Sequence, residues 1–342
     1  MFDAAARAAA LTPGRTCPPH YGYSPRVFAR QPDIEADTLY VIGGLYGNPF
    51  ALDEIDRMAA LERQPPRRVF NGDFHWFDAE PRLFASVQRR VLSHTALRGN
   101  VETEIAADDD AAGCGCAYPE SVPDDDVERS NRILIRLRDV ATGVADAREQ
   151  LAVLPMHAVA RVGRLRIGIV HGDAWSLAGW RFAHDRLHDD SGAERLQAAF
   201  ELGAVDGWAC SHTCAPALKV LGDRFVINNG AAGMASFEGD GSGLLTRLSI
   251  RPLPAALAAS RAFGLYERGV WIDALRVRFD LARWLERFDR LWPSGSAAAV
   301  SYRDRIARGP SFTIDHALGR ETAACAVSVR LRQSDHCRAP ID

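Results

Sequence analysis

Lysine is nearly absent from this chain of 342 residues, and so is any marked excess of charge. Lys219 is the only lysine, so arginine supplies almost all of the positive charge. Arginine pairs well with phosphate, but a formal net charge of −3 gives no electrostatic basis for binding nucleic acid or an anionic membrane. We therefore expect neither of them as a partner.

Long apolar runs and regular cysteine spacing are also missing. No stretch of 18 apolar residues occurs, and residues 1–16 contain no apolar core of signal-peptide length. The default expectation is therefore a cytoplasmic protein. The seven cysteines are irregularly spaced, which is not typical of a disulfide framework and predicts reduced thiols. No P-loop, dinucleotide fingerprint or nucleophile elbow is present.

Residues 38–252 alternate between short apolar runs and amphipathic stretches. The amphipathic stretches, at 51–61, 83–91 and 193–202, predict helices. The apolar runs each end in a polar or glycine-rich turn and predict buried strands; they are 39–42, 69–70, 96–97, 165–170, 208–210, 225–227 and 244–250. Strands that alternate with helices indicate an α/β fold.

The other parts of the chain have a different character. Residues 1–37 form an N-terminal extension in which 17–21 is expected to be extended. Residues 103–150 form an insertion, and 320–342 lack periodicity and are predicted to be disordered. The insertion begins with an acidic segment, 103–126, that contains Cys114 and Cys116. We interpret it as a flexible loop rather than half of a zinc or redox site, because no second cysteine pair stands at a suitable spacing.

Residues 253–319 are predicted to be a helical C-terminal extension. Within it, residues 270–292 carry a broad apolar stripe that predicts one long helix. Such a helix must pack on the main domain, on a partner subunit in a homo-oligomer, or as a lid. Packing on its own domain is the favoured alternative.

Polar fragments follow five of the predicted strands, at the end of a sheet where α/β proteins bind their ligands. They are Gly44-Leu45-Tyr46-Gly47-Asn48, Gly72-Asp73, Gly99-Asn100-Val101-Glu102, His171-Gly172 and Ser211-His212-Thr213-Cys214. Asp73 suits a carboxylate that bridges two metal ions, and Asn100, His171 and His212 offer neutral donors. Each fragment alone is more often an ordinary turn or a hydrogen-bonded histidine. Five in one chain are unlikely to be accidental.

In this order the fragments resemble the calcineurin-like metallophosphoesterase family, and most closely its small bacterial and archaeal phosphodiesterases. The resemblance covers residues 38–252. The segment from Val41 to Leu52 looks like the family's first strand and D-x-H-G-N loop, and Asn71-Gly72-Asp73 looks like its G-D motif. Leu97-Arg98-Gly99-Asn100 is similar to G-N-H, Val170-His171-Gly172 to the isolated His-Gly, and Ser211 to Pro216 to G-H-T-H-x-P. The family fold is a four-layer α/β/β/α sandwich with two mixed sheets.

The resemblance implies one retained metal site and one altered site. Asp73, Asn100, His171 and His212 match the ligands of one ion. The ligands private to the other ion fall on Gly44, Tyr46 and Cys214. The implied activity is hydrolysis of a phosphate mono- or diester by a metal-bound water. The cofactor would be one or two divalent ions, with manganese, iron or zinc as the candidates, and a small phosphate ester would be the substrate.

Three hypotheses remain open. In the first, one ion supports hydrolysis although Val101 replaces the histidine of G-N-H, and Glu102 or His75 could stand in for that histidine. In the second, Tyr46 and Cys214 rebuild the other site, with His75, Asp173 and Cys210 as further donors; the favoured alternative is that the two only fill the vacated space. In the third, the chain is catalytically silent and binds a nucleotide, a metabolite or a partner protein.

Overall fold

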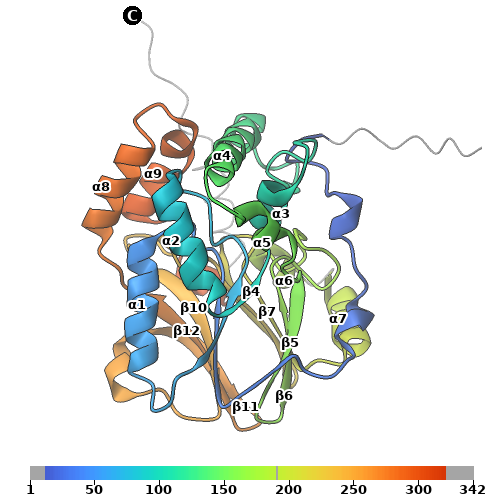
Figure 1. Ribbon diagram of the computed structural model, residues 1–342. Helices are drawn as coiled ribbons and strands as arrows, with labels where there is room; N and C mark the ends of the chain where they lie inside the picture. The colour runs from blue at the N-terminus through green and yellow to red at the C-terminus, as the bar shows by residue number, and fades with distance from the viewer. Residues whose placement is uncertain (1–11, 190–191, 321–342) are drawn as a thin grey trace, which may run out of the picture.

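Two six-stranded sheets packed face to face form the centre of the computed structural model, which describes residues 12–189 and 192–320 (Figure 1). The first sheet has the order β1 (Ile34–Ala36), β5 (His157–Val162), β6 (Leu165–Val170), β7 (Gly207–Cys210), β9 (Arg224–Asn229) and β8 (Pro216–Leu221). The second has the order β11 (Arg261–Glu267), β12 (Val270–Val277), β10 (Gly243–Ser249), β2 (Thr38–Ile42), β3 (Arg67–Asn71) and β4 (Thr95–Leu97). Both sheets mix parallel and antiparallel pairs.

Helices cover the outer faces of both sheets (Figure 1). The α-helices are α1 (Pro49–Ala60), α2 (Pro81–Leu92), α3 (Asn100–Ala106), α4 (Asp124–Thr142), α5 (Ala147–Ala152), α6 (His184–Leu187), α7 (Ala193–Gly203), α8 (Leu281–Leu291), α9 (Ala297–Arg308) and α10 (Ile314–Ala317). Short 3-10 helices span Pro19–Tyr21, Pro25–Phe28 and Ala255–Ser260. The predicted α/β sandwich with two mixed sheets is confirmed.

Strand β2 shows why the apolar runs are continuous. Side chains of a strand alternate between its two faces, and here both faces are buried. Leu39 and Val41 belong to the core between the two sheets. Tyr40 and Ile42 belong to the core beneath α1, α2 and α8. A strand buried on both sides has no polar face, so its apolar run is continuous. The carboxyl end of β2, and the polar loop that follows it, lie at one edge of the sandwich.

Asn48 ends the loop after β2 and begins α1. Its side chain accepts hydrogen bonds from the backbone N–H groups of Phe50 (3.0 Å) and Ala51 (3.1 Å), and Pro49 occupies the first turn. This is a standard helix N-cap followed by proline. The asparagine of the first polar fragment therefore shapes the loop as a helix cap.

The single helix predicted over residues 270–292 is wrong. Residues 270–277 form β12, which pairs with β10 and β11, and α8 begins only at Leu281. Ile272 and Ala274 face the core between the sheets, whereas Leu275 and Val277 face the helices. Because both faces of β12 are buried, its apolar residues give the broad stripe expected of a helix. The segment 253–319 is therefore not all helical, and the predicted homo-oligomer stays a prediction.

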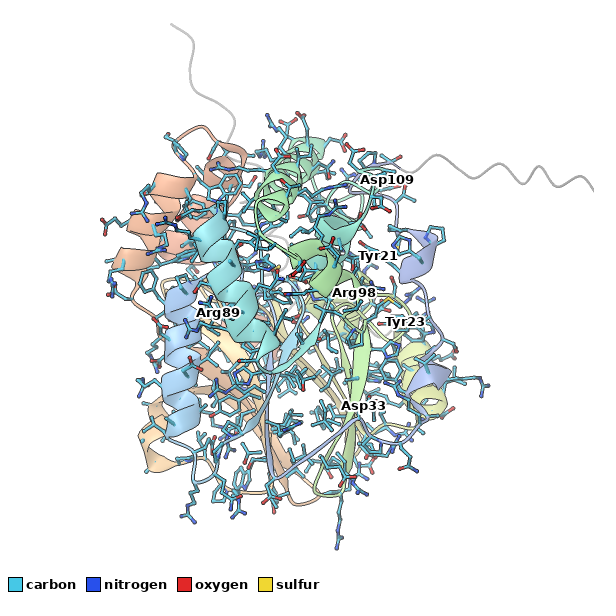
Figure 2. All side chains as sticks on the ribbon, in the orientation of Figure 1. Tyr21, Tyr23, Asp33, Arg89, Arg98 and Asp109 are labelled. Carbon is cyan, nitrogen blue, oxygen red and sulfur yellow. The ribbon has the colours of Figure 1, made fainter. Side chains whose placement is uncertain are left out.

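The N-terminal segment is part of the domain rather than a separate extension. Residues 19–21, expected to be extended, form a 3-10 turn, and β1 pairs in parallel with β5 at the edge of the first sheet. Tyr21 donates a hydrogen bond to Glu104 of α3, and Tyr23 donates one to the backbone oxygen of Asp173 (2.7 Å); both tyrosines are labelled in Figure 2. The predicted disordered tail lies, from residue 321 onward, outside the described residues.

Candidate metal site

Four loops bring Asp73, Asn100, His171 and His212 together. Asp73 follows β3, Asn100 is the first residue of α3 after β4, His171 follows β6 and His212 follows β7. Strands β2, β3 and β4 are mutually parallel, as are β6, β7 and β9. Their carboxyl ends meet at one edge of the sandwich, as the sequence predicted. All four side chains are buried, with at most 6% of each residue exposed.

The donor atoms of these four residues converge on one point. His171 Nε2 lies 3.3 Å from Asp73 Oδ2, 3.1 Å from Asn100 Oδ1 and 3.1 Å from His212 Nδ1. Of the histidines, cysteines and acidic residues that the structure describes, Asp73, His171 and His212 are the group that brings three ligand atoms within 4.8 Å of one another. The arrangement has the size of a coordination shell.

Hydrogen bonds on the outer side of the cluster determine which atoms face inward. His171 Nδ1 lies 2.9 Å from the backbone oxygen of Asn71, and His212 Nε2 lies 3.0 Å from that of Cys116. A carbonyl oxygen only accepts, so both nitrogens carry hydrogen, and the inward nitrogens present lone pairs. Asn100 donates through Nδ2 to the backbone oxygen of Cys114 (2.9 Å), which turns its Oδ1 inward. Such outer contacts are typical of metal-binding histidines.

The four inward atoms all present lone pairs, and none carries a hydrogen that could bond to the others. A cation among them would stabilise this arrangement. Without a metal ion that cation is a proton on His171. Burial alone lowers the pKa of His171, but the Asp73 carboxylate and the hydrogen bond to Asn71 outweigh burial, and the pKa is raised. Burial and the neighbouring His171 lower the pKa of His212 to about 3. The donor set therefore fits a divalent ion, which would replace the proton.

Glu102 holds the Asp73 loop in place. Its carboxylate accepts hydrogen bonds from the backbone N–H groups of Asp73 (2.8 Å), Gly99 (2.8 Å), Phe74 (2.9 Å) and His75 (3.3 Å). Asp73 itself has a φ of 52°, which is unfavourable for a residue other than glycine. Glu102 thus stabilises a strained loop beside the candidate ligands. Its lone pairs are used there, so the hypothesis that it replaces the missing histidine as a proton donor is not supported.

The other substitute donors make hydrogen bonds in their own loops, although the buried His75 Nε2 has no hydrogen-bond partner among the described residues. His75 Nδ1 lies 2.6 Å from Asp78 Oδ2, and its ring stacks on Phe84 with centroids 3.7 Å apart. Asp173 accepts hydrogen bonds from the backbone N–H groups that follow it, at residues 175, 176 and 181. Cys210 donates to the backbone oxygen of residue 227. Each has a structural role in its own loop.

Tyr46 and Cys214 bind one another. The Tyr46 hydroxyl lies 2.6 Å from Cys214 Sγ, and burial raises the pKa of both groups, so they form a neutral pair. Both residues have positive φ, 55° and 56°, and Gly44 has 63°. A Cβ on Gly44 would lie 3.1 Å from a ring carbon of Tyr46. The loop that matches the second ion's ligands is therefore filled by the tyrosine ring.

The segment around Cys114 and Cys116 covers the site, which corrects the expectation of a flexible loop. Cys114 is fully buried and Cys116 is 7% exposed. Their backbone oxygens accept hydrogen bonds from Asn100, His212 and the Trp180 indole N–H (3.0 Å). Sequence reasoning missed these contacts. The available signal was the pair of cysteines, since free cysteine is among the most often buried residues, whereas the flanking aspartates suggested exposure.

Comparison with known proteins agrees with this geometry at the level of the fold. No protein-family model and no curated protein matches the sequence. The structure resembles a metallophosphoesterase from Sphaerobacter thermophilus, with 16% identity and a TM-score of 0.51, over 80% of this chain and 99% of that one. It also resembles a hypothetical protein from Pyrococcus horikoshii OT3, with 15% identity and a TM-score of 0.53, over 81% and 99%. The fold is that of the metallophosphoesterases.

With only 16% and 15% identity, these structural similarities show the fold alone. Any catalytic activity must be argued from the residues of this chain. The coarse expectation of a calcineurin-like fold is confirmed; the altered second site is not tested by the comparisons. In the described part of the chain, no helix is long and apolar enough to cross a membrane. In this structure, the four converging side chains lie near a neutral Tyr46–Cys214 pair.

Proposed function

We propose that this chain is a metal-dependent phosphoesterase that holds one divalent ion through Asp73, Asn100, His171 and His212. The observation that carries the proposal is the convergence of four lone-pair donors, each oriented by a hydrogen bond or loop on its outer side. Mixed nitrogen and oxygen donors suit manganese, iron or zinc. The substrate class is a phosphate mono- or diester.

A bound ion would supply Lewis acidity toward a phosphoryl oxygen and an acidified water. The chain's own contribution is positioning. Asn71 and Cys116 keep both imidazoles in the tautomer that presents a lone pair, and Glu102 holds the Asp73 loop. Val101 offers no proton to a leaving group, so a substrate with a good leaving group is expected to react best.

The Tyr46–Cys214 pair supports one ion rather than two. A second ion at this position would need the tyrosine or the thiol to lose its proton, and burial raises the pKa of both. The two groups already satisfy each other by a hydrogen bond. We therefore treat them as residues that fill the space of the other site.

The test is metal content by elemental analysis on the wild type, Asp73→Ala and Cys214→Ser. We expect one ion per chain in the wild type and in Cys214→Ser, and none in Asp73→Ala. Hydrolysis of an activated phosphodiester should follow the metal content. Full metal content in Asp73→Ala would show that the ligand assignment is wrong. Two ions per chain in the wild type and one in Cys214→Ser would show that Tyr46 and Cys214 rebuild the second site.

A catalytically silent metal-binding protein is the second candidate. The observation that favours it is burial, since the four donors lie beneath the Cys114–Cys116 segment and are at most 6% exposed. In that case the metal-loaded protein would bind one ion and hydrolyse neither activated monoesters nor activated diesters. Turnover that disappears with Asp73→Ala would exclude this candidate.

A further inference from the structure

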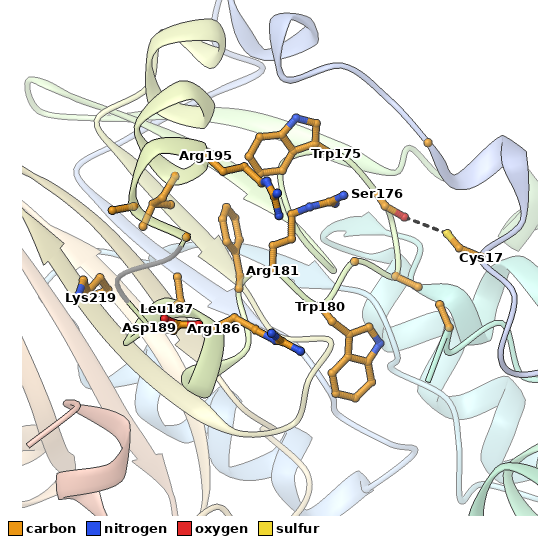
Figure 3. A pocket seen from close by; sticks show the side chains of 18 of the residues that line it. Cys17, Trp175, Ser176, Trp180, Arg181, Arg186, Leu187, Asp189, Arg195 and Lys219 are labelled. Atoms are coloured by element: carbon orange, nitrogen blue, oxygen red, sulfur yellow. Dashed lines mark hydrogen bonds between the residues drawn. The ribbon is translucent and has the colours of Figure 1, made fainter. Parts of the chain in front are cut away.

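A cavity of about 690 Å³ lies beside the amino end of α7 and is separate from the candidate metal site (Figure 3). None of the four candidate ligands lines it. Its size falls within the range of roughly 300 to 1,000 Å³ that is typical of small-molecule sites. Its walls come from the N-terminal segment, the loop after β6, the start of α7 and strand β8.

The cavity concentrates positive charge in a chain that is negative overall. Arg181, Arg186, Arg195 and Lys219 line it, whereas Asp189 is the one acidic residue among the lining side chains. Two of these cations pair with carboxylates outside the lining, Arg181 with Asp173 (3.3 Å) and Arg186 with Asp185 (3.9 Å). Arg195 and Lys219 make no ion pair with any other residue that the structure describes. The chain's only lysine therefore points to an anion rather than to a structural salt bridge.

The amino end of α7 adds to this positive field. Gly192 and Ala193 line the cavity, and α7 is an 11-residue helix whose N-cap, Gly192, has no side chain to bind the first N–H groups. The helix dipole, about half a positive charge at the amino end, favours an anion near this position. A phosphate is a suitable group, because guanidinium groups and helix amino ends both bind it well.

Two tryptophans supply flat apolar surface in the same cavity. Figure 3 shows Trp175 and Trp180 at opposite ends, with the side chains of Arg181 and Arg186 between them. Both indoles are partly exposed, and the Arg181 guanidinium lies over the Trp175 ring, 5.1 Å from its centroid. Half-buried tryptophans beside arginines are well suited to stacking a planar ring.

We propose that this cavity binds an aromatic ring that carries a phosphate, the chemistry of a nucleoside monophosphate. The ring would stack against the partly exposed Trp175 indole, and the phosphate would be bound by Arg195 and Lys219. The site goes beyond the proposed function, because it uses none of the candidate metal ligands. It adjoins them through Trp180, whose ring packs edge-on against that of His212 with centroids 5.3 Å apart. The Trp180 indole and the His212 imidazole both donate to the backbone oxygen of Cys116.

The test is calorimetric titration of the full chain with three probes: AMP, adenosine and ribose 5-phosphate. AMP should bind about tenfold or more tightly than either fragment, because only AMP uses both the aromatic and the cationic walls. No binding of AMP would overturn the proposal. Ribose 5-phosphate binding as tightly as AMP would also overturn it, since the tryptophans would then have no role.

Variants locate the binding and separate it from the metal site. Lys219→Ala and Trp175→Ala should each weaken AMP binding about tenfold. Arg89→Ala is the matched control, since it removes an exposed cation on α2 outside the cavity, and it should bind like the wild type. AMP binding should persist in Asp73→Ala. Loss of binding in Asp73→Ala, or equal binding by Lys219→Ala, Trp175→Ala and the wild type, would overturn the proposed location.

Discussion

Replacement of Glu102 by glutamine tests whether the candidate metal site depends on a single buried carboxylate. The carboxylate accepts four backbone hydrogen bonds, two on each oxygen. A glutamine amide has one oxygen and can accept at most two of them, so its NH₂ group would face at least two N–H donors. Each buried donor left unsatisfied costs about 1–3 kcal/mol, so Glu102→Gln should lower the free energy of unfolding by about 2–6 kcal/mol.

Glu104→Gln is the matched control on the same helix. Glu104 is 2% exposed, and the hydrogen bond that the structure gives its side chain comes from the Tyr21 hydroxyl. A glutamine oxygen can still accept that bond. We expect a change of no more than about 1 kcal/mol.

The assay is equilibrium unfolding in urea, in which a shift of the midpoint at constant slope reports a change in stability. Metal affinity provides a second readout, because Glu102 binds the backbone N–H of Asp73. It should fall by about 10- to 100-fold in Glu102→Gln, as for residues that orient metal ligands. If Glu102→Gln and Glu104→Gln unfold within about 1 kcal/mol of each other and bind metal with equal affinity, the Glu102 carboxylate does not hold the Asp73 loop.

Three further predictions follow from the same region and from the core. Gly44→Asp restores the carboxylate found at this position in the calcineurin-like family. It should lower the melting temperature and add no second ion, because Gly44 has a φ of 63° and the Tyr46 ring occupies the space. A second ion found by elemental analysis would contradict this prediction. Metal affinity should fall about tenfold per pH unit once the pH is below the pKa of His171, since a proton competes for Nε2. Although burial alone lowers that pKa, Asp73 raises it above 6.5, so the decline should begin above pH 6.5 in a pH series of titrations. Arg247→Met should cost about 3–5 kcal/mol in urea unfolding, because Arg247 is fully buried and pairs with two carboxylates.

Local sequence patterns were enough to predict most of the central strands and the order of the polar loops. Strands such as β2, β3 and β6 are short apolar runs bounded by polar turns, and this pattern is local. Asp73, Asn100, His171 and His212 each stand directly after such a run. Parallel strands end at the same edge of a sheet, so the sequence predicted that these residues would lie close together without knowledge of any single contact.

The antiparallel hairpins were not predicted, although they leave a local signal. Strands β5, β8, β11 and β12 lie in antiparallel hairpins with glycine in the turn: Gly163, Gly222 and Gly269 all have positive φ. Arg268 and Gly269 both have positive φ, which is typical of a two-residue hairpin turn. Because β12 is apolar on both faces, its composition favoured the prediction of a helix. The Arg268-Gly269 turn, which indicates a hairpin, was given too little weight.

The surroundings of the four donors could not be predicted, because they come from segments that are distant in the chain. Cys114 and Cys116 lie in an acidic segment that looks exposed in sequence, yet their carbonyls determine how Asn100 and His212 are oriented. Tyr46 and Cys214 are 168 residues apart in the chain and form one hydrogen bond. Contacts of this kind depend on which loops meet in space and which groups lose water there, and neither is encoded in the local periodicity of the chain.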